Sequence, residues 1–276
     1  MASKGSGSTV ELTPDEERDV EERTPPRAAV VFETVRREGQ TELDRPVFSL
    51  TLSGFAAGLS MGASLAGLGL IRSMLPDAHW RPLVDSFGYT LGFLIVILGR
   101  QQLFTENTIT AILPLLDSED KIRKLVQVLR LWAAVLISNL AGAGLFALAA
   151  AHTNIFSEEI RTTFSQIGHE AIAPGFASIV LRGIASGWLI ALMVWMLPGS
   201  EGMRPVVVII ITYFVGLGSF SHIIAGSVET LYLVWTGDIS FATYLTGFLL
   251  PVFIGNVIGG TSLVALLNYG QVVAEG

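Results

Sequence analysis

The sequence predicts an all-α membrane protein of six transmembrane helices, arranged as an inverted 3+3 repeat in which the second and fifth helices are broken. First, 51% of the 276 residues are hydrophobic and only 15% are charged, whereas about a quarter of the residues of soluble proteins are charged. Second, the chain after residue 46 consists of apolar blocks, each long enough for the roughly 20 helical residues that cross a bilayer. Third, two of these blocks are interrupted by polar residues at corresponding places in the two halves.

Residues 1–45 are predicted to form an acidic cytoplasmic region. The first 27 residues bury too little apolar surface to offset the entropy of ordering, so we expect disorder there. They also lack the apolar core of a signal peptide. Residues 26–42 mix valines with charged residues, which is typical of a short amphipathic helix on the membrane surface or of a disordered linker. Much of the formal charge of −7 belongs to this region, because residues 11–23 hold seven acidic and two basic residues.

Residues 46–270 are predicted to form the transmembrane domain, and residues 271–276 a cytoplasmic tail. Four apolar blocks predict one span each, at 47–71, 125–151, 176–197 and 242–268. The blocks 84–116 and 206–235 are too long for one straight helix. Polar residues between 100 and 107 and between 216 and 222 predict a break in each.

Basic residues near the span ends predict the orientation, because cytoplasmic loops retain Lys and Arg. With the N-terminus inside, the cytoplasmic ends would hold eight of these residues and the outer ends three. We therefore expect a multi-pass protein of the cytoplasmic (inner) membrane with both termini in the cytoplasm and an outer loop at 152–174. The inner set is Arg36, Arg37, Arg45, Lys121, Arg123, Lys124, Arg130 and Arg204, and the outer set is Arg72, Arg81 and Arg161.

An internal repeat supports the inverted arrangement. Thr105 in the first break precedes Asn139 by 139 − 105 = 34 residues, and His222 in the second break precedes Asn256 by 256 − 222 = 34 residues. Three spans per half is an odd number, so the halves insert with opposite topology. Inverted repeats with discontinuous helices are typical of transport proteins, whose sites lie where the broken helices meet.

The breaks also have a physical meaning. Lipid cannot hydrogen-bond a non-helical backbone, at a cost of several kcal/mol per group, so a break must face protein or a polar pore. A helix N-terminus exposed there carries partial positive charge and free N–H groups, which suit an anion. The alternative is that both breaks are glycine-rich kinks packed against their neighbours.

His222 is the histidine of the apolar blocks, since His79, His152 and His169 fall in predicted loops. We expect a neutral imidazole, which can donate a hydrogen bond to a small anion or pass it a proton. The alternative is a helix-packing histidine bonded to a backbone carbonyl. The Thr105 hydroxyl could partner His222 or the substrate.

Two further groups of residues are candidates for the pore. Asn139 and Asn256 could contact substrate, or could satisfy the loose backbone ends of the breaks. Apolar side chains near the breaks are candidates for constrictions that gate by dewetting, although each alone could equally face lipid or a neighbour. They are Tyr89, Phe93, Leu103, Phe104 and Val215.

Enzyme and cofactor signals are missing from the sequence. The chain has no Cys, and it contains no Gly-rich phosphate loop and no His and Asp cluster at metal-ligand spacing. We therefore expect neither an enzyme nor a resident cofactor or metal.

Over residues 45–270 the motifs resemble those of the formate/nitrite transporter family. The resemblance implies an aquaporin-like protomer, a homopentamer with one pore per protomer, and passage of small monovalent anions such as formate or nitrite. It implies that His222 is the central pore histidine and Thr105 its loop partner, and that the five apolar candidates are pore constrictions. The motifs are Leu103-Phe104-Thr105, His222-Ile-Ile-Ala225, Asn139-x-x-Gly142, Asn256-x-x-Gly259 and Arg182-Gly183 with Trp188.

The sequence departs from the family pattern at four positions near the breaks. Gln102 and Ser221 stand where the family usually has an acid, and Gly187 and Gly226 where it has asparagine. Passage of small monovalent anions remains the leading hypothesis, with the lipid bilayer and further copies of the chain as partners and no nucleic acid. The alternatives are an aquaporin-like pore for a small neutral solute, and a non-conducting membrane scaffold or sensor.

Overall fold

The computed structural model describes residues 10, 12–24, 26–265 and 270, and within them every regular element is a helix. The predicted tail at 271–276 lies outside the described residues. Five helical runs are long and apolar enough to cross a membrane. They are α3 (Val47–Ser73), α4 (Arg81–Leu98), α7 (Lys121–His152), Phe176–Gly199, which contains α9 (Phe176–Met196) and a 3₁₀ turn (Leu197–Gly199), and Phe241–Ser262. The predicted all-helical, multi-pass membrane protein is confirmed at this level.

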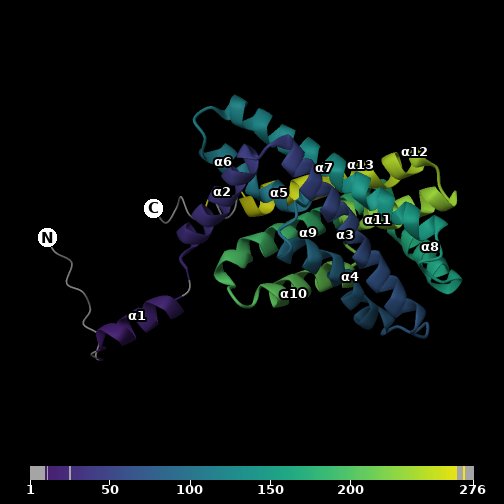
Figure 1. The fold of residues 1–276 in the computed structure, drawn as a ribbon, viewed down its shortest axis with the longest axis horizontal. Helices are drawn as coiled ribbons and strands as arrows, with labels where there is room; N and C mark the ends of the chain where they lie inside the picture. Colours follow the sequence, from purple (N-terminus) through teal and green to yellow (C-terminus); the bar gives the residue numbers. More distant parts are fainter. Residues whose placement is uncertain (1–9, 11, 25, 266–269, 271–276) are drawn as a thin grey trace.

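The long helices pack side by side into one bundle (Figure 1). Its outer surface is apolar, with Ile137 68% and Leu181 67% exposed, while His222 and Asn139 are buried inside. This pattern is the reverse of a soluble protein and suits a lipid environment. The last run combines α12 (Phe241–Tyr244) and α13 (Leu250–Ile258) with π-helical turns at Leu245–Leu249 and Gly259–Ala265.

Each of the two interrupted blocks contains separate helices. The first comprises α4, α5 (Phe104–Thr110) and α6 (Ile112–Asp117), and the second comprises α10 (Arg204–Leu217) and α11 (Ile223–Thr236). Residues 99–103 and 218–222 lie between the helices.

The helices α4 and α10 end in the same way. The N–H of Gln101 donates to the carbonyl of Val96 at 3.0 Å, and the N–H of Phe220 donates to the carbonyl of Val215 at 3.0 Å. Arg100 (φ 51°) and Ser219 (φ 50°) occupy the left-handed position that precedes each donor. This is the Schellman motif, which satisfies the last carbonyls of a helix and reverses the chain.

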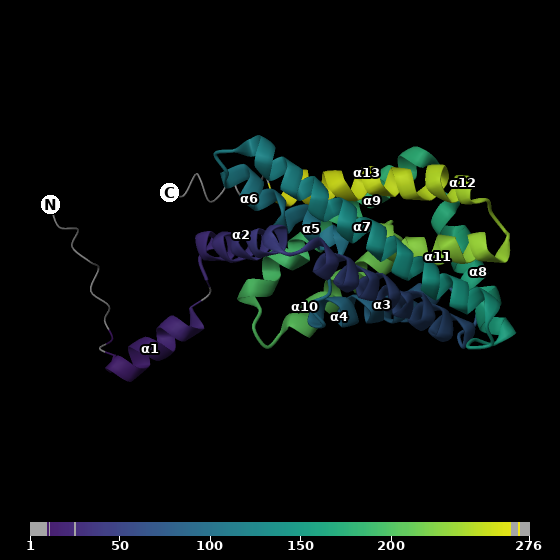
Figure 2. The ribbon, with the colours of Figure 1, turned by 45° about the horizontal axis from the view of Figure 1, so that its top comes forward.

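Two helices lie where we predicted disorder or a loop. Helix α1 (Pro14–Arg23) begins after Thr13, whose N–H donates to Glu16 Oε2 at 2.8 Å while the Glu16 N–H donates to Thr13 Oγ1 at 3.4 Å. Helix α8 (Glu158–Ile172) begins after Ser157, whose hydroxyl caps its first turn. The predictions of disorder and of a loop were wrong here because they considered apolar content and overlooked these capping signals. Figure 2 shows α1 projecting away from the bundle.

Helix α2 (Ala28–Asp44) answers the question left open for residues 26–42. It is amphipathic, but its apolar face packs against protein, with Val35 in a buried cluster with Ile109, Leu113, Ala191 and Val194. The α2 helix is therefore a part of the bundle that covers α5, α6 and α9.

Glycines bring the helices that carry Asn139 and Asn256 into close contact with their neighbours. A Cβ at Gly58 of α3 would lie 1.9 Å from the backbone oxygen of Asn139, and one at Gly187 of α9 would lie 2.5 Å from the backbone oxygen of Asn256. Both contacts are with backbone, so no side chain can move aside. The small residues allow α3 to approach α7 and α9 to approach α13.

We expect Gly58→Ala to destabilise the protein, because the added methyl group must push two helices apart. Overpacking of this kind costs about 1–3 kcal/mol, which lowers the melting temperature by roughly 2 °C or more. Gly144→Ala on α7 is the matched control, because its Cβ would meet only Leu231 Cδ1 at 3.7 Å. Thermal unfolding in detergent measures both, and equal melting temperatures would contradict the close-packing argument.

Candidate functional site

The first break is held by the side chain of Asn139 from α7. Its Nδ2 donates to the carbonyl oxygens of Gly54 at 2.7 Å and Gln102 at 2.9 Å. Its Oδ1 accepts from the N–H of Phe104 at 2.9 Å, the first residue of α5. One amide therefore connects a neighbouring helix, the break and the start of the next helix.

The second break is held in the same way by Asn256 from α13. Its Nδ2 donates to the carbonyl oxygens of Gly183 and Ser221, both at 2.9 Å. Its Oδ1 accepts from the N–H of Ile223 at 2.9 Å. Both amide hydrogens of each asparagine are thus used on backbone groups, as expected if these residues satisfy the loose backbone of the breaks.

These hydrogen bonds correct the register of the repeat. Phe104 and Ile223 play the same part and are 223 − 104 = 119 residues apart, which makes Leu103 the counterpart of His222. The equal spacing of 34 residues paired Thr105 with His222, which are not at equivalent positions. Leu103 and His222 are the N-cap residues of α5 and α11.

His222 and Thr105 meet in the interior of the bundle. The His222 Nε2 lies 2.8 Å from Thr105 Oγ1, and both side chains are buried. The His222 Nδ1 accepts from the backbone N–H groups of Ile224 at 3.3 Å and Ala225 at 3.2 Å, so it caps α11. An accepting Nδ1 carries no proton, and the neutral imidazole therefore has its hydrogen on Nε2 and donates it to Thr105.

The predicted constriction residues lie in two places. Tyr89 and Val215 line the cavity described below, and Phe93 packs edge-on against the His222 ring with 4.9 Å between ring centroids. Leu103 and Phe104 are fully buried at the start of α5. The Phe104 ring contacts Trp132 and Phe253 at centroid distances of 5.8 and 5.7 Å.

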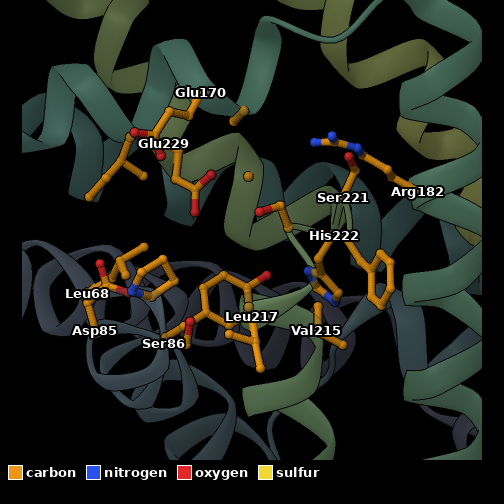
Figure 3. A pocket seen from close by; sticks show the side chains of 18 of the residues that line it. Leu68, Asp85, Ser86, Glu170, Arg182, Val215, Leu217, Ser221, His222 and Glu229 are labelled. Carbon is orange, nitrogen blue, oxygen red and sulfur yellow. The ribbon is translucent and has the colours of Figure 1, made fainter. Parts of the chain in front are cut away.

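A cavity of about 510 Å³ leads to His222 (Figure 3). His222, Ser221 and Val215 line it together with residues from α3, α4, α8 and α9. Its charged lining residues are Arg72, Arg81, Asp85, Glu170, Arg182 and Glu229. Sequence reasoning missed the acidic residues among them as site residues, because they are far apart in the chain.

Sequence reasoning also missed Glu42 on α2. Its Oε1 accepts from Gln102 Nε2 at 3.2 Å, and its Oε2 accepts from Asn107 Nδ2 at 3.1 Å and from the Thr110 hydroxyl. Burial raises the pKa of Glu42 from an ordinary 4.5 to about 7, because desolvation of the carboxylate outweighs these hydrogen bonds. This carboxyl group attaches α2 to the first break and to α5.

The departures from the family pattern fit their surroundings. The Gln102 amide donates to Glu42, whereas an acid at this position would place two carboxylates together. Gly187 has no room for a side chain beside the Asn256 backbone. A Cβ at Gly226 would lie 2.2 Å from Phe248 Cζ, so the Phe248 ring fills the space an asparagine would need.

A multi-pass helical bundle in which two helix breaks meet at a buried His–Thr pair, below a charged cavity, defines a membrane transport protein. Residues 29–270 match the model of the formate/nitrite transporter family, so the chain belongs to this family, as the motifs predicted. It is 42% identical to the inner membrane protein YfdC of Escherichia coli, over 91% of this chain and 81% of that protein. It is 26% identical to the formate channel BtFdhC of Bacillus thuringiensis, over 87% and 93% of the two chains.

Solved structures show the same fold. A pentameric formate channel with formate bound aligns with a TM-score of 0.69 and 20% identity, over 82% of this chain and 98% of that chain. An ion channel of the same family aligns with a TM-score of 0.72 and 20% identity, over 88% and 98%.

We expect the attachment of α2 to weaken as the pH rises through about 7. The pKa of Glu42 is higher in the folded protein than in the unfolded chain, so folding favours the protonated form, and ionisation above pH 7 opposes the buried contact. Hydrogen exchange of residues 28–44, corrected for intrinsic rates, should show less protection at pH 8 than at pH 6.

Glu42→Gln should remove this pH dependence, because glutamine stays neutral. Asp44→Asn is the control on the same helix, since its carboxylate is exposed and accepts from Gln40, and it should behave as the wild type. If Glu42→Gln keeps the wild-type pH dependence, Glu42 does not control the attachment.

Proposed function

We propose that this protein passes small monovalent anions of the formate and nitrite type across the cytoplasmic membrane, through a pore in each protomer. The Thr105–His222 pair carries the proposal, because it brings two polar side chains from two helix breaks to the end of a cavity. Membership of the formate/nitrite transporter family and the similarity to a formate channel support it.

The central histidine acts in this proposal as a hydrogen-bond donor that orients Thr105. Because Nε2–H donates to Thr105 Oγ1, the threonine hydroxyl hydrogen is directed elsewhere, and no acceptor for it is found among the described residues. That hydrogen can bind an anion in the pore. A proton relay through the imidazole would require protonation of Nδ1, which would displace the two backbone N–H groups it caps. The geometry therefore favours the donor role over the relay.

The constrictions flank this pair in the proposal. Tyr89 and Val215 narrow the cavity side of the pore, which their position in the lining supports. Phe93 holds the imidazole ring, and Leu103 and Phe104 close the pore near the start of α5.

The two halves form an inverted 3+3 repeat with broken second and fifth spans in this proposal. The matching Schellman ends and the two asparagine bridges, each displaced by 119 residues, support it. Both termini lie in the cytoplasm, which the eight-to-three distribution of basic residues supports. In Figure 1, α2 and α6 lie at one end of the bundle and α8 at the other.

The protein assembles as a pentamer in this proposal. The neighbouring structure is a pentameric channel, and the apolar outer faces of the helices suit contact with lipid or with other protomers. Native mass spectrometry in mild detergent should give a pentamer, and monomers alone would contradict the assembly.

A flux panel in proteoliposomes tests the function against its alternatives. Formate, nitrite, nitrate, chloride, hydrosulfide, acetate and glycerol are compared at equal concentration gradients. Anion flux supports the proposal, flux of glycerol alone would support a neutral-solute pore, and no flux would support a scaffold or sensor.

We expect Thr105→Val to reduce anion flux by at least about tenfold, because it removes the hydroxyl at nearly constant volume, a loss typical of one hydrogen bond to a charged group. Thr105→Ser keeps the hydroxyl and should restore most of the flux. Wild-type flux through Thr105→Val would show that the hydroxyl does not contact the anion.

His222→Phe should assemble but lose anion flux, because phenylalanine neither donates to Thr105 nor caps α11. His222→Asn should retain measurable flux with a weaker pH dependence, because asparagine is a good N-cap and keeps a donor without titrating. If His222→Phe transports at the wild-type rate with the wild-type pH profile, the histidine is structural.

A further inference from the structure

The Glu229 carboxylate is an unpaired acid in the wall of the cavity. It lies on α11 two turns after His222, its side chain is 8% exposed, and it lines the cavity that ends at His222. Figure 3 shows its carboxylate pointing into this space. Within the part of the chain that the structure describes, no hydrogen bond or ion pair reaches its oxygens.

The other two carboxylates of the cavity are paired. Arg72 Nε contacts Asp85 Oδ2 at 2.8 Å, and Arg72 Nη1 contacts Glu170 Oε2 at 2.7 Å. Glu229 is therefore the acid of this lining whose charge the surrounding protein leaves without a direct partner. A buried, unpaired charge is costly, which is why such a group marks a place where an ion or a proton is exchanged.

The balance of charge in the cavity depends on Glu229. Three arginines, Arg72, Arg81 and Arg182, line it together with three carboxylates, Asp85, Glu170 and Glu229. With all six ionised the lining has no net charge, and with Glu229 protonated it has one positive charge in excess. Among the described residues Arg182 of α9 makes no ion pair, so its charge remains available in the cavity.

We propose that Glu229 determines access of anions to the Thr105–His222 pair, admitting them when it is protonated and repelling them when it is ionised. The inference rests on the proposed anion function and adds a charge-selective residue to it. An ionised Glu229 cancels the attraction of Arg182 and adds direct repulsion in a cavity where water screens charges weakly. Protonation of Glu229 takes one proton from the solution in the cavity and leaves the anion itself unchanged.

Other titratable and charged groups face Glu229 from the elements around it, and each has a defined place. Arg72 comes from α3, Arg81, Asp85 and Tyr89 from α4, Glu170 from α8, Arg182 from α9 and His222 from α11. Within the described residues, α7, α12 and α13 contribute no charged residue to the lining. His222 is engaged at both ring nitrogens and Asp85 and Glu170 are paired, which leaves Glu229 as the unpaired carboxyl that can change the charge.

The test compares Glu229→Gln with the wild type in proteoliposomes with the same pH on both sides, at pH 5.5 and pH 8.5. The anion is whichever of formate or nitrite the wild type carries faster, and the ratio of variant to wild type cancels the protonation of the anion itself. We expect the ratio to be near one at pH 5.5 and at least about tenfold at pH 8.5. Arg182→Gln should lower flux at both pH values, and the double variant should exceed Arg182→Gln at pH 8.5.

Glu158→Gln is the matched control. It removes the same charge from α8, but its side chain is 94% exposed and lies outside the cavity. It should leave flux unchanged at both pH values. A Glu229→Gln ratio near one at pH 8.5, or the same gain with Glu158→Gln, would overturn this inference while anion flux through the wild type upholds the proposed function. No anion flux through the wild type would instead overturn the proposed function.

Discussion

Hydrogen bonding of the backbone at two helix breaks inside the bilayer is the constraint on which the site depends. Lipid offers no donor or acceptor, so each break needs a protein partner for its loose N–H and C=O groups. Asn139 and Asn256 each provide two donors and one acceptor to the break and to an adjacent helix. They can reach because Gly58 and Gly187 let the helices approach at backbone distance. Glycine packing and asparagine bridging are thus parts of one device.

Fixing both breaks also fixes the state of His222. The residue begins α11, and its Nδ1 accepts from the backbone N–H groups of that helix. This contact selects the neutral tautomer with hydrogen on Nε2, and the 2.8 Å contact with Thr105 then joins the two breaks. A single side chain therefore caps one helix and orients the hydroxyl of another. The same economy makes the imidazole a poor free acid or base, because both ring nitrogens are already engaged.

The titratable carboxyl groups lie on either side of this neutral centre. Glu42 holds α2 to the first break through Gln102, Asn107 and Thr110, and Glu229 lies unpaired in the cavity. The centre itself contains amide, hydroxyl and imidazole groups without a formal charge. Family positions that usually carry an acid beside the pair are Gln102 and Ser221, and in this chain carboxylates instead come from α2 and from two turns along α11. Sensitivity to pH is thereby separated from the contact with the anion.

The sequence by itself determined the helical membrane class, the apolar blocks, the polar interruptions and the residue types His222, Thr105, Asn139 and Asn256, because these depend on composition and on local pattern. It underestimated α1 and α8, whose capping signals are local but carry little apolar content. Only the tertiary structure decided the register of the two breaks, the tautomer of His222 and the roles of Glu42 and Glu229. Each of these depends on contacts between residues far apart in the chain, such as Glu42 with Thr110 or Asn139 with Gly54. Such contacts arise from helix packing distances, which no local pattern encodes.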